Sequence, residues 1–146
     1  MSEQTEYGPS TLPTVRVVGA AVMCRGRLLV SCRAPQRRLG GYWEFPGGKL
    51  ESGENYAQAC VREIKEELKC LVIPGELVTV VEHDYEDFHL YMQILRCELK
   101  EGEYPRLDPA EHRALLWATR ADLEGLTFVP ADQEAVWEIS AKLELA

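Results

Sequence analysis

The stretch Gly48–Cys70, GKLESGENYAQACVREIKEELKC, joins a glycine-containing loop to an acidic segment with helical periodicity. A helix is predicted from about Tyr56 to Leu68, with Asn55 as its N-cap and Gln58 completing a capping box. The apolar residues that recur at helical spacing are Ala57, Cys60, Val61, Ile64 and Leu68. This stripe predicts that one face of the helix packs against a core.

A second face of that helix is acidic. Glu63, Glu66 and Glu67 stand at i, i+3 and i+4, a spacing that places side chains together. Like charges so placed repel, each i,i+4 pair by roughly 0.2–0.5 kcal/mol, and Arg62 offsets only part of this. Clustered carboxylates with little counter-charge are what Mg²⁺ or Mn²⁺ requires. Taken alone, three such glutamates also fit a solvated helix face, because acidic helix faces are common.

The loop before the helix adds further oxygen ligands. Gly47 and Gly48 permit a close backbone approach and can offer bare carbonyls. Glu51 and Glu54 bring two more carboxylates toward the start of the helix. Loop and helix together predict a site able to hold more than one cation.

The complete set of spaced residues resembles the signature of the Nudix hydrolase family, G-x5-E-x7-R-E-U-x-E-E-x-G-U, in which U is bulky and aliphatic. The matching residues are Gly48, Glu54, Arg62, Glu63, Ile64, Glu66 and Glu67. Two positions depart from it: Lys69 replaces the glycine and Cys70 the last aliphatic residue. Neither position binds metal in the family. Lys69 is expected to strain a left-handed helix end by on the order of 1 kcal/mol, or to end the helix differently.

The resemblance extends beyond this signature. Residues Val17–Arg33, Trp43–Lys49 and Glu111–Val136 are similar to the MutT-type branch, which includes bacterial CTP pyrophosphohydrolases and 8-oxo-dGTP diphosphatases. It covers nearly all of the chain after Pro13. The resemblance implies an α/β fold of the Nudix type, an α/β/α sandwich with a mixed central sheet and the loop and helix at its active site.

The resemblance also implies metal ligands. These are the Gly47 carbonyl and the carboxylates of Glu63, Glu66, Glu67 and Glu111, binding Mg²⁺ with Mn²⁺ as a substitute. Such cations neutralise charge on phosphate oxygens and lower the pKa of a bound water. Glu111 stands outside the signature, and a surface glutamate beside His112 is the competing interpretation.

One carboxylate is expected to act as the general base that accepts a proton from the attacking water. Glu63 is favoured, with Glu67 and Glu111 as rivals. Arg62 is expected to orient a neighbouring carboxylate through a charge-assisted hydrogen bond, with Glu54 in a supporting role.

Four residues are predicted on the substrate side: Arg33, Gly48, Lys49 and Asp132. Arg33 stands where MutT-like enzymes contact the nucleotide, whereas Arg37 and Arg38 fit a solvated loop better. The carboxylate of Asp132 suits the exocyclic amine of cytosine or the N1–H and amine of guanine. It also suits an N-cap of the last helix, and the two roles are compatible.

The flanking segments complete a mixed sheet with helices packed against it. Strands are predicted at residues 15–24 and 27–32 as a hairpin, at 43–45 where 46–48 stop the strand, at 71–82 and 88–99 as an antiparallel pair, and at 113–118. A helical turn begins at 119–122, and a final helix covers 131–145 with Ala135, Val136, Ile139 and Leu143 inward. Residues 1–13 form a flexible arm before a single domain at 14–146.

Composition narrows the partners. A net charge of −8 disfavours nucleic acid polymers, while a bound metal would still admit a small nucleotide. No apolar run could span a bilayer and no signal peptide is evident, which favours a cytoplasmic protein without a membrane partner. The five cysteines contain no C-x-x-C pair and are expected to be mostly buried, reduced thiols. Monomer and homodimer stay open.

The predicted reaction is Mg²⁺-dependent hydrolysis of a (deoxy)nucleoside triphosphate to the monophosphate and pyrophosphate. The favoured substrates are 8-oxo-dGTP and CTP- or dCTP-type nucleotides, with nucleotide-pool sanitising, and so DNA repair, as the purpose. Two alternatives remain: hydrolysis of another linked nucleotide, such as an ADP-sugar or a dinucleoside polyphosphate, and a non-catalytic nucleotide sensor.

Overall fold

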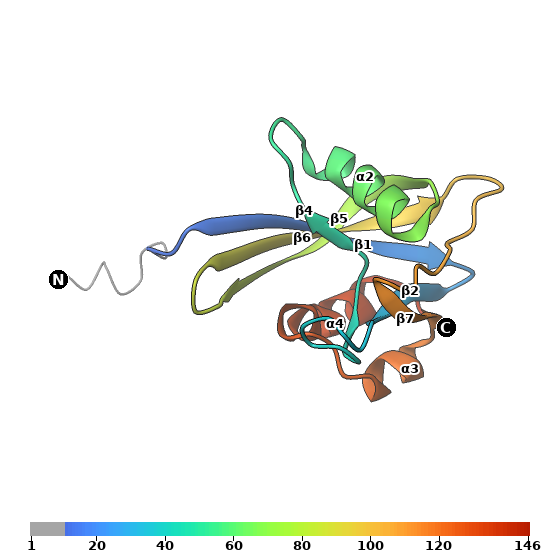
Figure 1. Ribbon diagram of the computed structural model, residues 1–146. Helices are drawn as coiled ribbons and strands as arrows, with labels where there is room; N and C mark the ends of the chain where they lie inside the picture. The colour runs from blue at the N-terminus through green and yellow to red at the C-terminus, as the bar shows by residue number, and fades with distance from the viewer. Residues whose placement is uncertain (1–10) are drawn as a thin grey trace.

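The computed structural model describes residues 11–146, which fold around a seven-stranded mixed sheet (Figure 1). The strands are β1 (Thr14–Cys24), β2 (Arg27–Arg33), β3 (Trp43–Glu44), β4 (Gly47–Lys49), β5 (Val72–Asp84), β6 (His89–Leu99) and β7 (His112–Ala118). The helices are α2 (Tyr56–Leu68), α3 (Arg120–Gly125) and α4 (Pro130–Lys142). Helix α2 lies on one side of the sheet and α3 and α4 on the other, which confirms the predicted α/β/α arrangement (Figure 1). The predicted arm lies almost wholly outside the described residues.

Strand β1 is the centre of the sheet. It runs parallel to β6 over ten paired residues, and antiparallel to β2 and β4. Its side chains alternate between two hydrophobic clusters: Val18, Ala20 and Val22 pack with α2, whereas Ala21 and Met23 pack with α4. Burial on both faces explains why this segment is a continuous apolar run rather than an alternating one.

The hairpin between β1 and β2 is confirmed, although it is short. Arg25 and Gly26 both have positive φ angles, 53° and 76°, the geometry of a tight two-residue hairpin turn. Only two residue pairs follow the turn. Strand β2 then leaves β1 and pairs with β7 and β3.

The predicted strand does end before residues 46–48, at Glu44, but the chain then begins a separate strand, β4, that was not predicted. Gly47–Lys49 pairs with Val17–Gly19 of β1, in the space that β2 has left. The absence of a side chain permits this approach: a Cβ built on Gly47 would lie 2.0 Å from the carbonyl oxygen of Val18. The glycines therefore place the loop directly on the central strand.

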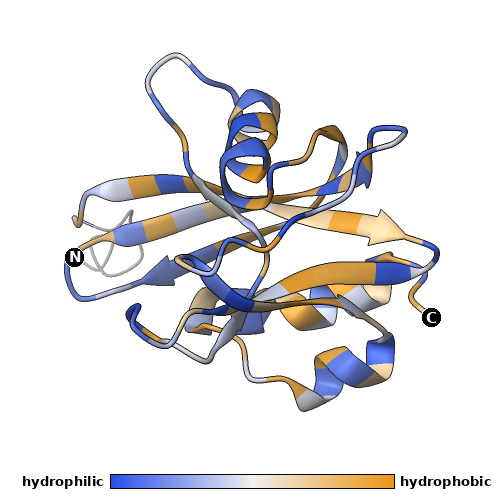
Figure 2. Ribbon diagram, turned by 45° about the vertical axis from the view of Figure 1, so that its right-hand side comes forward, coloured by the Kyte–Doolittle hydropathy of each residue, from blue (hydrophilic) through white to orange (hydrophobic). Residues whose placement is uncertain are grey.

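Helix α2 begins as predicted. The Asn55 side chain accepts a hydrogen bond from Gln58 N at 2.8 Å, and Gln58 Oε1 accepts one from Asn55 N at 2.9 Å. The buried residues are Ala59, Cys60, Ile64 and Leu68. Ala57 is exposed and Ala59 is buried in its place, because helical periodicity does not show which part of the first turn meets the sheet. Figure 2 shows the mixture of hydrophilic and hydrophobic residues along this helix.

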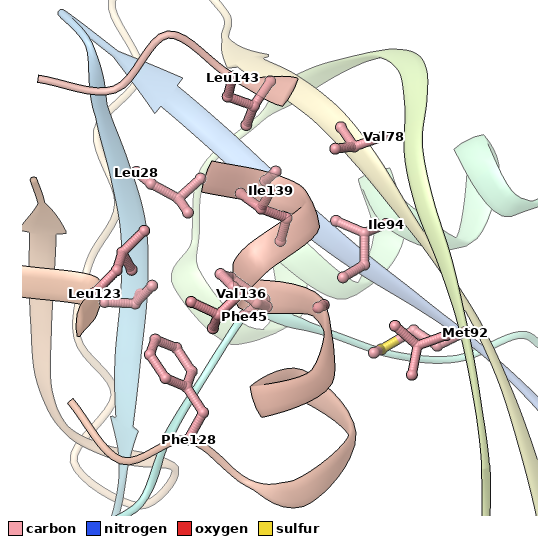
Figure 3. Packing of buried hydrophobic residues seen from close by; sticks show 14 of the residues in the cluster. Leu28, Phe45, Val78, Met92, Ile94, Leu123, Phe128, Val136, Ile139 and Leu143 are labelled. Carbon is pink, nitrogen blue, oxygen red and sulfur yellow. The ribbon is translucent and has the colours of Figure 1, made fainter. Parts of the chain in front are cut away.

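The opposite face of the sheet is covered by α4. Its residues Ala135, Val136 and Ile139 are buried as predicted, and Figure 3 shows Ile139 and Val136 among side chains of the sheet. The helix ends at Lys142 rather than Leu145, because Leu143 adopts an extended backbone. The Leu143 side chain still enters the core.

The remaining predictions of secondary structure are confirmed with small shifts. Strands β5 and β6 form the long antiparallel pair, and Thr119 caps α3. All five cysteines are free thiols, and four are buried, whereas Cys24 is exposed beside the hairpin turn. Across residues 11–146, no helix has the length and apolar character needed to cross a bilayer.

Lys69 occupies the left-handed C-cap of α2, with φ 55° and ψ 36°. A side chain is strained there, so Lys69→Gly is expected to stabilise the protein by about 1 kcal/mol. Urea denaturation with an unchanged m-value measures this. Lys65→Gly, in the helical last turn, should instead destabilise by about 1 kcal/mol. A lower stability for Lys69→Gly would mean that the bond from Lys69 Nζ to Glu66 O, at 2.6 Å, outweighs the strain.

Candidate active site

Helix α2 turns its acidic face toward the β4 loop and β3, with unequal burial. The side chains of Glu63 and Glu67 are 16% and 18% exposed, whereas that of Glu66 is 60% exposed. Glu63 and Glu67 therefore belong to an enclosed site, and Glu66 lies at its open side. A helix face that was merely solvated would not bury two of its three carboxylates.

Arg62 binds the carboxylates at the entrance to this site. Its Nε lies 2.6 Å from Glu54 Oε2, and its Nη1 lies 3.0 Å from Glu63 Oε2 and 3.3 Å from Glu66 Oε1. The hydrogen bonds from Arg62 and from the Glu51 amide lower the pKa of Glu54 to about 2. Arg62 is thus positioned to orient glutamates rather than to meet a phosphate, which fits the roles predicted for it and for Glu54.

Gly48 lies against the carboxylate of Glu63. A Cβ built on Gly48 would come within 2.4 Å of Glu63 Cδ. Any side chain at this position would displace the carboxylate. Together with the close approach of Gly47 to β1, this contact holds the double glycine between the central strand and the acidic helix.

Glu67 lies where four carboxylates meet. Burial, and then the negative charges of Glu44, Glu63 and Glu111, raise its pKa to about 9. Mutual repulsion of this kind indicates a missing positive charge, and oxygen ligands suit Mg²⁺ or Mn²⁺. The donor chemistry therefore fits a divalent cation. Among residues 11–146, however, no three acidic, cysteine or histidine side chains are already arranged to hold one.

Without metal, stability should fall as the pH rises. A carboxyl whose pKa is near 9 when folded and 4.5 when unfolded stabilises the fold fully below pH 4.5 and no longer above pH 9. The melting temperature in EDTA is therefore expected to fall as the pH rises through this range, and excess Mg²⁺ should restore stability at high pH. Glu67→Gln should remove the slope above pH 7, whereas below pH 7 the buried Asp132, whose pKa is raised to about 7, also contributes. An unchanged slope in that variant would assign the effect to other groups.

Glu44 is the buried carboxylate that the sequence interpretation overlooked. Its Oε1 accepts a bond from Arg33 Nη1 at 2.8 Å, and its Oε2 lies 3.3 Å from His112 Nε2. Burial opposes the ionisation of Glu44, but His112 and Arg33 outweigh it and lower the pKa. The available sequence signal was its place directly before the Phe45–Gly48 turn.

The sequence-predicted Glu111 reaches this cluster from the segment before β7. Its side chain is 44% exposed and lies 3.7 Å from Arg37 Nη1. Arg37 also donates to the Glu111 carbonyl at 2.8 Å, so it is tied to this segment rather than left as a solvated loop residue. The structure thus brings Glu44, Glu63, Glu67 and Glu111 together.

A cavity of about 510 Å³ adjoins the cluster through Arg33, which lines the cavity and binds Glu44, although none of the four carboxylates is part of the lining. Its lining combines cationic and apolar side chains, including Arg33, Arg38, Lys49, Tyr85, Phe88 and Val129. Arg33 is held in place, because it donates to Glu44 and, through Nε, to Arg38 O at 2.8 Å. A mixed lining of this kind suits a planar base at one end and phosphates at the other.

Asp132 is almost fully buried, and it is not an N-cap. The cap of α4 is Val129, and Asp132 stands in the first turn. Its Oδ2 accepts a hydrogen bond from Phe45 N at 2.8 Å, which directs the side chain toward β3 and away from the amides of its own helix. Burial raises the pKa of Asp132 to about 7.

A mixed sheet between helices, with an acidic helix against a double-glycine loop, defines the Nudix class of fold. The chain belongs to the NUDIX family: the NUDIX domain model matches residues 17–137. It is a MutT-like Nudix hydrolase, and enzymes of this family act on small nucleotides.

Relatives named for two different substrates are similar to this chain in sequence. The CTP pyrophosphohydrolase of Escherichia coli K12 is 31% identical over 81% of this chain and 85% of its own length. A putative 8-oxo-dGTP diphosphatase 2 of Mycobacterium tuberculosis is 35% identical over 88% and 90%. The solution structure of the E. coli ORF135 protein superposes with a TM-score of 0.76 at 29% identity, covering 92% and 94%.

Proposed function

We propose that the protein hydrolyses a nucleoside or deoxynucleoside triphosphate to the monophosphate and pyrophosphate, using Mg²⁺ or Mn²⁺. The convergence of four carboxylates beside a cavity lined by Arg33, Arg38 and Lys49 carries this proposal. An acidic cluster needs a cation, and a cation beside arginine and lysine suits a polyphosphate. The relatives named for CTP and for 8-oxo-dGTP support nucleotide-pool sanitising as the purpose.

The proposed mechanism divides the work among the chain's residues. Glu63, Glu66, Glu67, Glu111 and the Gly47 carbonyl would hold divalent cations, whose bound form supplies charge neutralisation and a more acidic water. Arg62 and Glu54 orient the carboxylates near the loop. Glu63 accepts the proton of the attacking water, with Glu67 and Glu111 as the alternatives. Arg33, Lys49 and the Gly48 backbone position the nucleotide.

Hydrolysis of a nucleotide panel tests the proposal, with all nucleotide products separated by chromatography and free pyrophosphate assayed in parallel. The panel should include 8-oxo-dGTP, dGTP, CTP, dCTP, 5-methyl-dCTP, ADP-ribose and a dinucleoside tetraphosphate, each with Mg²⁺ and with EDTA. Mg²⁺-dependent pyrophosphate from a triphosphate is the expected result. Turnover confined to ADP-ribose or the dinucleoside tetraphosphate would instead support hydrolysis of another linked nucleotide. A rise in melting temperature with ligand but without turnover would support a nucleotide sensor.

Asp132 is expected to give base recognition a pH dependence. With a pKa of about 7, its carboxylate accepts hydrogen bonds from a base amine above neutrality and becomes a protonated group below it. For substrates with an exocyclic amine, kcat/KM should therefore fall roughly tenfold as the pH drops through 7, the value of one hydrogen bond. Asp132→Asn should flatten that profile, and dTTP, which has no such amine, is the control. Equal profiles for both nucleotides would refute this role.

A further inference from the structure

His112 is a buried polar residue that the proposed mechanism does not use. Its side chain is 0% exposed, and neither ring nitrogen has a hydrogen-bond partner of ordinary geometry among the described residues. A buried polar group without a partner costs stability, so its presence requires an explanation. A hydrophobic residue would fill the same space more favourably if packing were the only need.

A β-bulge in β7 turns the His112 ring toward the acidic cluster. The register of β2 and β7 shifts between Cys32, which pairs with Ala114, and Arg33, which pairs with His112. Arg113 is skipped in the backbone register between the two strands. Side chains alternate along a strand, so this one-residue bulge moves His112 from the face it would share with Ala114 to the face of Arg33. Bulges are often found where a functional side chain must be re-aimed.

The ring then lies between two carboxylates. Nε2 of His112 is 3.3 Å from Glu44 Oε2 and 3.9 Å from Glu67 Oε1. Glu44 cannot easily move, because Arg33 binds its other oxygen at 2.8 Å. Glu67 hydrogen-bonds to Glu63, itself an acidic side chain, rather than to an arginine, and its negative neighbours oppose its ionisation. His112 is therefore the group best placed to fix the Glu67 carboxylate.

We propose that His112 is a positioning residue of the metal site: its imidazole donates the Nε2 hydrogen across the Glu44–Glu67 pair and fixes Glu67 for cation binding. The inference rests on the proposed function only in needing a divalent cation at Glu67. Residues that hold metal-binding carboxylates from behind typically contribute 10–100-fold to metal affinity or activity.

Two substitutions at His112 separate positioning from packing. His112→Leu fills the space without a donor, whereas the amide nitrogen of His112→Gln reaches the depth of Nε2. Arg113→Leu introduces the same leucine at the exposed residue beside it and is the matched control. For each protein, calorimetric Mn²⁺ binding without nucleotide, kcat and KM at saturating Mg²⁺, and the melting temperature are measured.

His112→Leu is expected to weaken Mn²⁺ binding and lower kcat by at least tenfold each, with KM within threefold and the melting temperature unchanged or higher. His112→Gln and the control should stay within threefold of wild type. Equal behaviour of the leucine and glutamine variants, whether both active or both impaired, would overturn the proposal. If wild type binds Mn²⁺ but hydrolyses no triphosphate, the proposed function fails while the Mn²⁺ affinities still decide the role of His112. Absence of Mn²⁺ binding in wild type would overturn both.

Discussion

Glu67→Gln is expected to lower kcat by a factor on the order of 10²–10³ or more while leaving the melting temperature unchanged or slightly raised. The catalytic loss follows because a neutral amide cannot replace the carboxylate that holds the cation. Without the cation, the charge on the phosphate oxygens is not stabilised. The stability follows because burial and the charges of Glu44, Glu63 and Glu111 oppose the ionisation of Glu67, a cost that a neutral amide does not carry. Steady-state pyrophosphate release with Mg²⁺ and thermal unfolding in EDTA measure the two effects.

Glu76→Gln is the control for Glu67→Gln, because Glu76 is exposed on β5. It should change neither quantity. Full Mg²⁺-dependent activity in Glu67→Gln would show that the cation site has been assigned to the wrong side chains. A sharp loss of melting temperature would show instead that Glu67 supports the fold, contrary to its unfavourable surroundings.

Gly47→Ala is expected to be the most destabilising single-methyl change in the loop. The new Cβ would lie 2.0 Å from Val18 O, at a φ of 153° that side chains rarely adopt. Either β4 separates from β1 or β1 moves within the core, at a cost of about 3 kcal/mol or more. A fall in melting temperature of roughly 10 °C is expected by differential scanning fluorimetry, together with loss of metal-dependent activity.

Gly53→Ala separates the two causes. Gly53 also has a positive φ, 86°, but a Cβ there would meet nothing within 4 Å. It should therefore cost only about 1 kcal/mol, the strain of a left-handed backbone. Similar losses in both variants would attribute the effect at Gly47 to its dihedral angle rather than to the contact with β1.

Local features were predictable from the sequence. The capping box of Asn55 and Gln58 and the shared face of Glu63 and Glu67 depend on residues a few positions apart, so helical geometry alone places them. Residues 46–48 were misread because glycine and proline usually interrupt strands, and only the partner strand β1 shows that here they permit one.

Contacts between residues far apart in the chain could not be predicted from the sequence. Glu44 and His112 are sixty-eight positions apart in the chain, and a register shift between β2 and β7 unites them. Asp132 looked like a helix cap because it stands near a helix start, yet its partner is Phe45 N, on another element. Such pairings depend on sheet topology, which one sequence does not specify residue by residue.

The parallel alignment of β1 with β6 constrains the order in which the molecule can assemble. Residues 14–23 find their main partner only at 89–98, so during synthesis the most apolar strand waits until nearly two thirds of the chain has emerged. Helix α2 packs on a surface that β6 helps to form. It is therefore synthesised before that surface is complete. Because distant pairing slows folding, refolding from urea should take milliseconds to seconds rather than microseconds. Meanwhile the unpaired strand offers an aggregation-prone edge to other nascent chains.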